Sequence, residues 1–345
     1  MTIKIGILGL GGIGAAHAQA LAALADSGTE VSLEAFSGSA RSAAGFGWPD
    51  ARRLTADELI ADQSIDVLTV CSPSAFHAEH TSAALCAGKH VVVEKPMALT
   101  TTDAERVRDQ ASAAGLVVSP VAQRRFEPLN IELKAAIASG QLGRVVLGET
   151  FVHWHRSDDY YAEADWRTDA DGGGGSLMNQ GLHNADLLCW LLGGATAVAG
   201  HTATLGHDIA AEDTAVAALR FANGALGVIA TTTATGVGEP SELSIWTTTG
   251  SARITQSGIS QWDFPTAPRP TESEVPASGA SDPRAIGIAG HVAQWADVLG
   301  ALTTGTEPMI TADDGVATVA VLDGIYRSAA GGRTVDVGMI SAAES

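Results

Sequence analysis

Basic side chains are scarce in this sequence of 345 residues. Only 20 Lys and Arg stand against 39 Asp and Glu, which gives a formal net charge of −19 at pH 7. A surface with this charge repels the phosphates of nucleic acids and of anionic membranes. We therefore expect a small-molecule partner and neither a nucleic acid nor a membrane.

Cysteine is also rare, and long apolar runs are missing. The three cysteines, Cys71, Cys86 and Cys189, lack the spacing of a metal site, and such a sparse, odd set is typical of a reducing compartment. No run approaches the roughly 20 apolar residues of a membrane span. Residues 1–18 begin like a signal peptide, but five glycines interrupt the apolar run. These features predict a cytoplasmic protein.

Short β-branched segments alternate with alanine-rich segments over the first 125 residues. The expected strands are 3–9, 31–36, 66–72, 90–94 and 116–121, and the expected helices include 13–25, 75–87 and 101–114. Near-continuous apolar strands separated by helices are typical of a parallel, doubly wound sheet. The sequence therefore predicts an α/β fold that begins with a Rossmann domain over residues 1–124.

From about residue 145 the apolar segments become longer and are joined by short turns such as 222–224. This pattern predicts hairpins in an antiparallel sheet. The remaining expected elements are a helix at 176–192, an exposed loop at 263–285 and late helices at 288–304 and 312–330. We predict a C-terminal α+β domain over residues 125–345, with an open, mostly antiparallel sheet and late helices that can pack back on the first domain. The open sheet offers a face for self-association, so a homodimer or homotetramer is expected.

The first expected strand runs into a G-x-G-x-x-G motif, which consists of Gly9, Leu10, Gly11, Gly12, Ile13 and Gly14. Its glycines permit a tight turn and a close approach of the backbone to a pyrophosphate, and the following helix N-terminus supplies N–H groups. The motif lies between a strand and a helix, where this chemistry requires it. It therefore predicts a dinucleotide cofactor, NAD or NADP.

The end of the second expected strand bears on the choice of cofactor. Glu34 lies at the distance at which an acidic residue binds the ribose 2′-hydroxyl of NAD, but it falls inside the strand. The tip of the strand instead offers hydroxyls and a guanidinium, from Ser37, Gly38, Ser39 and Arg41. These groups suit a 2′-phosphate. NADP is therefore favoured over NAD, and both stay open.

Four segments together resemble the glucose–fructose oxidoreductase/inositol dehydrogenase/rhizopine-catabolism (Gfo/Idh/MocA) family. They are "GLGGIGAAHA" (9–18), "CSPSAFH" (71–77), "EKP" (94–96) and "GGGGSLMNQGLHNADLLCWLLG" (172–193). The resemblance covers essentially the whole chain. The segment 152–169 is similar to the subgroup that acts on pyranoses and sugar derivatives.

The resemblance implies three catalytic residues. Lys95 is expected to project from a strand end toward the nicotinamide and the reacting carbon, because strand carboxyl ends face the ligand crevice in this fold. His183 is expected to take the proton of an alcohol as hydride leaves the carbon. Asn179 lies four residues earlier on the same helix face and would orient His183. Many relatives carry an aspartate at this position, so the chain lacks a negative charge there.

The resemblance also implies supporting contacts. Further cofactor contacts are expected from Ser72, Pro73, His77, Glu94, Lys95, Gln123, Trp166 and Arg167. Substrate contacts are expected from Lys95, His155, Arg156, Tyr160, Arg167, Asn179 and His183. His153 and His155 share a strand face, but no third ligand has suitable spacing, so no metal is expected.

The predicted activity is hydride transfer between nicotinamide C4 and a ring hydroxyl carbon of a sugar, sugar derivative or cyclitol. One alternative is a glycoside hydrolase that keeps NAD bound and oxidises the sugar transiently. Another is a non-catalytic regulator that senses the nucleotide. Loss of the lysine or the histidine would be expected in such a regulator, and this chain has both Lys95 and His183.

Overall fold

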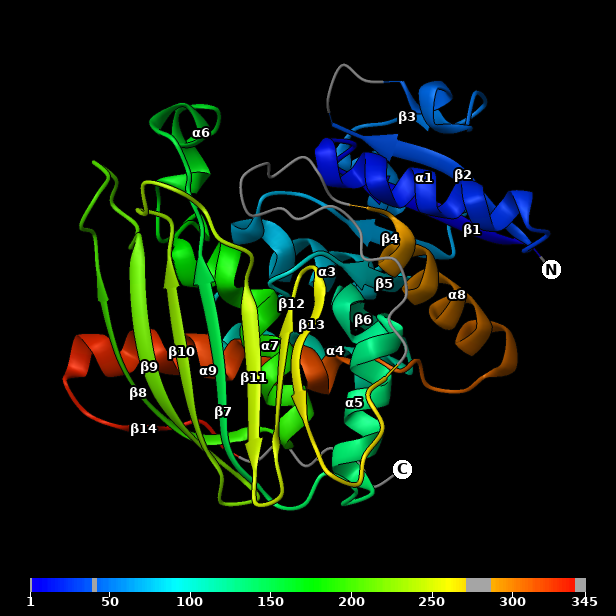
Figure 1. Ribbon diagram of the computed structural model, residues 1–345. Coiled ribbons are helices and arrows are strands. Elements are labelled where there is room, and N and C mark those ends of the chain that lie inside the picture. Colours follow the sequence, from blue (N-terminus) through cyan, green and yellow to red (C-terminus); the bar gives the residue numbers. More distant parts are fainter. Residues whose placement is uncertain (1, 39–41, 271–286, 339–345) are drawn as a thin grey trace. The chain divides into compact units, whose positions relative to one another are not determined.

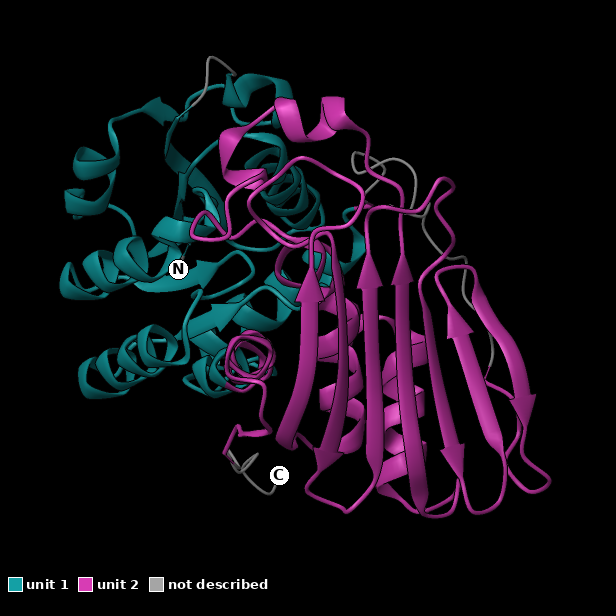
Figure 2. Ribbon diagram, turned by 90° about the vertical axis from the view of Figure 1, so that its left-hand side faces the viewer, with its two compact units in different colours: residues 1–123, 288–316 teal, residues 124–287, 317–345 magenta. Residues whose placement is uncertain are grey.

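The computed structural model describes residues 2–38, 42–270 and 287–338 (Figure 1). The chain forms two compact units, each made of two stretches of sequence (Figure 2). Unit 1 contains residues 1–123 and 288–316, and unit 2 contains residues 124–287 and 317–345. Within the described part of the chain, no helix has the length and apolar character needed to cross a membrane.

Unit 1 is built on a parallel sheet of six strands in the order β3-β2-β1-β4-β5-β6. The strands are β1 (Ile3–Leu8), β2 (Val31–Ser37), β3 (Arg52–Arg53), β4 (Val67–Val70), β5 (His90–Val93) and β6 (Val118–Pro120). The strand order reverses between β1 and β4, which is where ligands bind in doubly wound sheets. The predicted Rossmann fold is confirmed.

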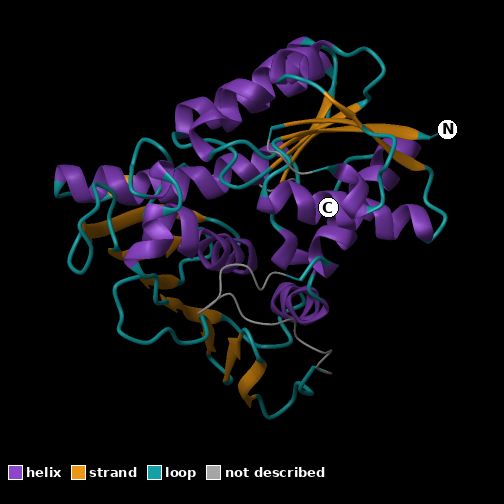
Figure 3. Ribbon diagram, turned by 90° about the horizontal axis from the view of Figure 1, so that it is seen from above, coloured by secondary structure: helices purple, strands orange, loops and turns teal. Residues whose placement is uncertain are grey.

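Helices cover both faces of this sheet (Figure 3). They are α1 (Gly12–Asp26), α2 (Ala56–Ala61), α3 (His77–Cys86), α4 (Thr101–Ala114) and α8 (Ala289–Thr304). Two short 3₁₀ turns, η1 (Ala43–Phe46) and η2 (Ser74–Phe76), lie in the connections, and a third, η3 (Gln123–Phe126), begins at the last residue of the first stretch of unit 1 and continues into unit 2. The late helix α8 packs on α1, and Leu21, Trp295 and Val298 share one buried core with β1 and β2. A helix from the end of the chain thus completes the first unit.

Unit 2 is built on an eight-stranded sheet in the order β13-β12-β11-β7-β10-β9-β8-β14. The strands are β7 (Val145–His153), β8 (Ala195–Ala203), β9 (Thr214–Phe221), β10 (Leu226–Thr232), β11 (Glu242–Thr247), β12 (Ser251–Thr255), β13 (Gly258–Asp263) and β14 (Val335–Asp336). Within this sheet, β7–β10 is the only parallel pair among the described strands. The predicted mostly antiparallel sheet is confirmed.

The helices of unit 2 are α5 (Pro128–Ala138), α6 (Asp158–Ala162), α7 (Leu182–Leu192) and most of α9 (Ala312–Gly331). A Cβ atom at Gly148 in β7 would meet Leu188 and Leu192 of α7, and one at Gly200 in β8 would meet Ile325 of α9. Both helices therefore pack closely on one face of the sheet. The opposite face carries exposed apolar side chains such as Val216 and Leu226.

Two predicted segments differ from the structure or lie partly outside it. The expected α-helix 176–192 is wrong over its first turns, because residues Ser176–Gly181 form a π-helix, η5, that leads into α7. Residues 271–285 of the expected loop 263–285 lie outside the described residues. Asp263 ends β13, and residues 264–270 contain neither helix nor strand.

Candidate active site

The loop after β1 contains two positions that require glycine. Gly9 has a φ of +105°, and a Cβ atom there would lie 2.6 Å from the carbonyl oxygen of Cys71. A Cβ atom at Gly14 would collide with the carbonyl oxygen of Gly9. Backbone conformation at the first position and helix–strand packing at the second therefore exclude any side chain.

The middle of the same loop is open. A Cβ atom at Gly11 or Gly12 would have no described atom within 4 Å. Gly11 precedes the first turn of α1, which contains no acidic side chain. Space in front of a helix N-terminus attracts an anion, because the unpaired N–H groups and the helix dipole point there. The loop therefore fits the pyrophosphate of NAD(P).

The end of β2 lies beside the glycine loop. Leu10 donates its backbone N–H to the carbonyl oxygen of Ser37 over 2.9 Å, and a Cβ atom at Gly38 would lie 3.4 Å from the Cα of Gly9. Ile13 packs against the core of unit 1. Ser39 and Arg41, which were predicted to bind the 2′-phosphate, lie outside the described residues.

The E-K-P segment follows β5 at the carboxyl edge of the parallel sheet. Glu94 is 4% exposed, and its Oε2 accepts the backbone N–H of Lys95 over 3.0 Å. Lys95 itself keeps partial exposure. Burial lowers the pKa of Lys95, and the charge of Glu94 opposes that shift. An ammonium with a lowered pKa exchanges its proton more readily near neutral pH, as acid–base chemistry on an alcohol requires.

His77 connects the segments that follow β4 and β5. Its Nδ1 lies 2.6 Å from the carbonyl oxygen of Pro96 and its Nε2 lies 2.7 Å from that of Ser72. Burial lowers the pKa of His77, against the effect of the two carbonyl oxygens. His77 is 2% exposed, so it connects the two loops from within the protein core. Pro73 follows Ser72 and precedes the short turn η2.

Gln123 lies at the start of η3, directly after β6. A Cβ atom at Gly290 would lie 3.0 Å from Gln123, so the two backbones approach closely. The buried Oε1 of Gln123 has no hydrogen-bond partner among the described residues. A buried amide oxygen of this kind can accept a hydrogen bond from a donor group on a ligand.

In unit 2, η5 and the first turns of α7 present two polar side chains. From Gly172 to Cys189, Asn179 and His183 alone keep partial exposure, and every other residue is buried. Asp186 lies one turn further on, but it accepts from Arg125 at 3.0 and 2.6 Å and from Thr318 at 2.6 Å. The ion pair with Arg125 anchors the helix and leaves Asn179 and His183 as its accessible polar groups.

Tyr160 joins several of the predicted substrate contacts. Its hydroxyl accepts from Asn179 Nδ2 at 3.2 Å and from Gln180 Nε2 at 2.7 Å. The guanidinium of Arg156 donates to Gln180 Oε1 over 3.1 Å and lies 5.4 Å from the Tyr160 ring. Burial lowers the pKa of Arg156, which is 3% exposed. Arg156 therefore orders this group of side chains from within.

Arg167 packs on the other side of the same tyrosine. Its guanidinium lies 4.2 Å from the Tyr160 ring centroid and donates to the Tyr160 carbonyl oxygen over 2.6 Å. Trp166 precedes it in the short turn η4 (Asp165–Arg167), with its ring 5.8 Å from the guanidinium. His155 is exposed, and its Nδ1 lies 2.7 Å from the carbonyl oxygen of Thr235. Three of the predicted substrate contacts, Arg156, Arg167 and Asn179, thus lie against the side chain of Tyr160, which is a fourth.

Comparison with known proteins assigns both parts of the chain to one family. Residues 3–121 match the oxidoreductase family model with an NAD-binding Rossmann fold, and residues 131–253 match the Gfo/Idh/MocA C-terminal domain. The chain belongs to the Gfo/Idh/MocA oxidoreductase family. The predicted resemblance is confirmed.

Among solved structures, the chain is similar to the WlbA dehydrogenase from Bordetella pertussis in complex with NADH and UDP-GlcNAcA. The two are 30% identical with a TM-score of 0.85, over 97% of this chain and 99% of that one.

Two curated relatives match over shorter stretches. The 1,5-anhydro-D-fructose reductase of Ensifer adhaerens is 32% identical over 49% of this chain and 51% of its own length. An NADP(+) scyllo-inositol 2-dehydrogenase of Bacillus subtilis is 31% identical over 57% of this chain and 54% of its own length. This Gfo/Idh/MocA chain therefore spans about half the length of these curated relatives.

Reasoning from the sequence missed two buried groups in this Gfo/Idh/MocA chain. One is His17, which lies in α1 and bonds Glu94, and the other is Glu212, which bonds the start of η5. A signal for His17 exists, because it lies at helical spacing from Gly14, Leu21 and Leu24 on the buried stripe of α1. For Glu212 we find no comparable local signal.

Proposed function

We propose that this protein is an NAD(P)-dependent oxidoreductase that moves hydride between the nicotinamide and a ring hydroxyl carbon of a sugar, sugar derivative or cyclitol. The glycine loop carries the proposal, because Gly9 and Gly14 exclude side chains, while a Cβ atom at Gly11 or Gly12 would meet no described atom within 4 Å. The cofactor supplies the hydride donor or acceptor when it is bound. Membership of the Gfo/Idh/MocA family supports the same chemistry.

Two residues are proposed to handle the proton of the alcohol. Lys95, with its lowered pKa, binds the oxygen, and His183 takes the proton during oxidation and returns it during reduction. Asn179 orients His183 and is itself held by Tyr160. Arg156 and Arg167 order this tyrosine from two sides, and hydroxyl-rich rings suit such a set of donors.

The substrate class follows from chemistry and from the relatives. The names of two curated relatives specify an anhydro-sugar and a cyclitol, and a similar structure contains a UDP-sugar. We propose a cyclic polyol or sugar derivative as the substrate of this chain. NADP is the proposed preference, supported by the residues after β2 and by the NADP(+) relative, although NADH is bound in the similar structure.

We also propose that the protein forms a homo-oligomer through the open face of the unit 2 sheet. This face carries Val216 and Leu226, which are 46% and 52% exposed, and the partly exposed Phe151, Val228 and Trp246. The registers of β7, β9, β10 and β11 place these side chains on one side. A sheet face with several exposed apolar side chains is typical of an interface.

The activity is tested with the purified protein, both dinucleotides and a panel of sugars, sugar derivatives and cyclitols, by following the absorbance of the reduced nicotinamide. Lys95→Ala should lower kcat by roughly 10²–10⁴-fold with little change in dinucleotide affinity. A Lys95→Ala protein with normal turnover and lower thermal stability would assign Lys95 a structural role. Glycoside cleavage by dialysed protein, without net reduction of NAD, would favour the hydrolase alternative.

A further inference from the structure

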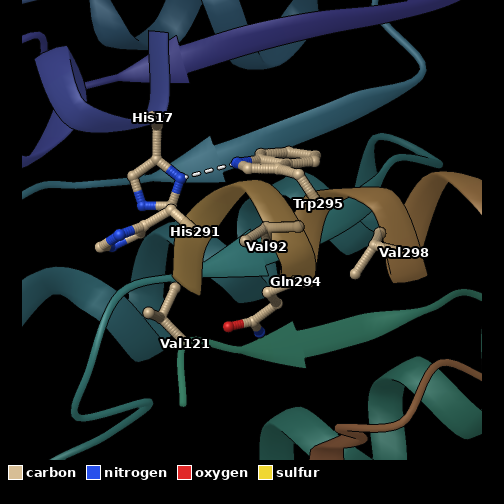
Figure 4. A pocket seen from close by; sticks show the side chains of 7 residues that line it. All are labelled: His17, Val92, Val121, His291, Gln294, Trp295 and Val298. Carbon is tan, nitrogen blue, oxygen red and sulfur yellow. Dashed lines mark hydrogen bonds between the residues drawn. The ribbon is translucent and has the colours of Figure 1, made fainter. Parts of the chain in front are cut away.

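A cluster of four buried polar side chains in unit 1 includes Glu94 of the E-K-P segment. It consists of His17 from α1, Glu94 after β5, and His291 and Trp295 from α8, all at most 4% exposed. Figure 4 shows His17 between the indole of Trp295 and the ring of His291, with its hydrogen bond to Trp295. Four polar groups in one core require an explanation, because burying them is costly unless they are paired.

The hydrogen bonds of His17 have a fixed direction. The indole N–H of Trp295 can only donate, and it lies 2.9 Å from Nδ1 of His17, so Nδ1 accepts. The ring proton is therefore on Nε2, which donates to Glu94 Oε1 over 3.1 Å. Burial lowers the pKa of His17, which agrees with a neutral ring that carries one proton. Trp295 therefore donates a hydrogen bond to His17, and His17 in turn donates one to Glu94.

This direction argues against a metal at the same place. His17, Glu94 and His291 offer ligand atoms that all lie within 4.8 Å of one another. A metal on Nε2 of His17 would replace the only ring proton, because Nδ1 already accepts from Trp295. The ring would then be an imidazolate. A hydrogen-bonded network satisfies His17 without that cost.

The network acts on the carboxylate of Glu94. Burial by itself raises the pKa of Glu94, but the hydrogen bond from His17 and the proximity of His291 keep that pKa well below its usual range. His291 lies 3.7 Å from Oε1, and its ring nitrogens have no hydrogen-bond partner among the described residues. The other oxygen accepts the backbone N–H of Lys95. An ionised carboxylate is thus locked directly beside Lys95.

We propose that Trp295 and His17 hold Glu94 ionised and oriented, and that Glu94 thereby sets the position and proton affinity of Lys95. His17 and Trp295 are positioning residues for Lys95, and their role in turnover rests on the proposed function. The other titratable groups near Glu94 are Cys71 after β4, His77 in α3 and, within the cluster itself, His291 in α8. Neutralising Glu94 lowers the pKa of Lys95, because the nearby negative charge stabilises the ammonium.

The test measures the proton affinity of Lys95 without using activity. Full-length protein is labelled with a trace of acetic anhydride across a pH series, and mass spectrometry compares Lys95 with the exposed Lys4. His17→Leu removes the donor to Glu94, so the labelling midpoint of Lys95 should fall by about 0.5–1 pH unit. His17→Gln keeps a donor and should restore most of the wild-type midpoint. Trp295→Phe removes the indole N–H that fixes the tautomer, and a smaller fall is expected.

Trp48→Phe is the matched control. The indole N–H of Trp48 donates to the carbonyl oxygen of Ala18 in α1 over 2.9 Å, so the variant removes a similar bond from the same helix without touching His17. Its Lys95 midpoint should equal that of the wild type. Because labelling needs no substrate, a midpoint shift supports the network even if no oxidoreductase activity is found.

Two outcomes overturn the proposal. One is an unchanged Lys95 midpoint in cooperatively folded His17→Leu and Trp295→Phe proteins. The other is an equal fall in Trp48→Phe, which would assign the effect to general loosening of α1. If His17→Leu does not fold, the comparison of His17→Gln, Trp295→Phe and Trp48→Phe decides the question by the same criteria.

In an active enzyme, the basic limb of kcat for carbonyl reduction should move with the labelling midpoint, because reduction needs a protonated Lys95.

Discussion

At residue 179 this chain has an amide, where the family resemblance leads us to expect a carboxylate in many members. Asn179 donates to the hydroxyl of Tyr160 over 3.2 Å, so its side chain is already oriented in the protein alone. An amide can hold a neighbouring imidazole by a hydrogen bond, but it adds no charge. The chemistry proposed for His183 therefore lacks the stabilisation that a carboxylate gives to an imidazolium.

Asn179→Asp should move the acidic limb of kcat/KM for alcohol oxidation to higher pH. The added negative charge favours protonated His183 and so raises its pKa, and oxidation requires the neutral ring. In the proposed mechanism Lys95 and His183 act on the same proton, so the observed midpoint would belong to both residues together. The measurement is a pair of pH–rate profiles at saturating dinucleotide. A limb that stays in place or moves to lower pH in an active variant would contradict this role for position 179.

Arg41 is predicted to select the cofactor. Arg41→Ala should weaken NADPH binding by roughly 1–3 kcal/mol and leave NADH binding nearly unchanged, because only NADPH carries the 2′-phosphate. Titration calorimetry with both dinucleotides measures the two affinities. Equal affinities in the wild type that do not change in the variant would point to Glu34 as the selector.

At the scale of the element, the start of η5 depends on a buried carboxylate from a distant loop. Glu212 accepts the backbone N–H groups of Ser176 and Leu177 and the hydroxyl of Tyr326 in α9. Gly175, with a φ of +110°, leaves room for this carboxylate, because a Cβ atom there would lie 2.6 Å from its Oε2. Glu212 thus pairs N–H groups that the first helical turn leaves unpaired, and so it supports the segment that carries Asn179 and His183.

Glu212 should make the stability of the protein depend on pH. Burial raises its pKa from the ordinary value of 4.5 to about 7, although its hydrogen bonds lower it. The folded state therefore binds more protons than the unfolded state between these values, so the free energy of unfolding falls as pH rises through this range. The loss is on the order of 3 kcal/mol and is complete above the folded pKa.

The measurement compares denaturant midpoints of the wild type and Glu212→Gln from acidic to mildly basic pH. The variant cannot ionise, so the stability difference between the two proteins should change across this pH range. Tyr326→Phe removes one donor to the carboxylate and should extend the loss to higher pH. Parallel pH curves for all three proteins would refute a raised pKa at Glu212.

At the scale of the whole molecule, self-association is predicted to depend on the open sheet face of unit 2. Val216→Asp combined with Leu226→Asp places charges on two neighbouring strands of that face and should convert the oligomer to smaller species. Sedimentation velocity measures the mass of the particle. Val237→Asp is the control, because Val237 is 78% exposed but lies outside the strands. A monomeric wild type, or an oligomer that survives the double substitution, would exclude this interface.

The fold and the glycine loop could be predicted because their signals are local. Apolar strands alternate with helices in unit 1, and hairpin turns such as 222–224 join the longer strands of unit 2. Gly9 and Gly14 are recognisable because backbone conformation and close packing admit no other residue there. The π-helix η5 was not predicted, since the same residues also suit an α-helix.

The two kinds of sheet, the dinucleotide loop and the family can all be predicted from the sequence, because their motifs are short and contiguous. Which polar groups share hydrogen bonds is known from the folded structure alone. Trp295 bonds His17 across 278 positions, His17 bonds Glu94 across 77, and Glu212 bonds Leu177 across 35. No periodicity or spacing encodes such pairs, because each forms only when separate elements pack and bury the two groups together.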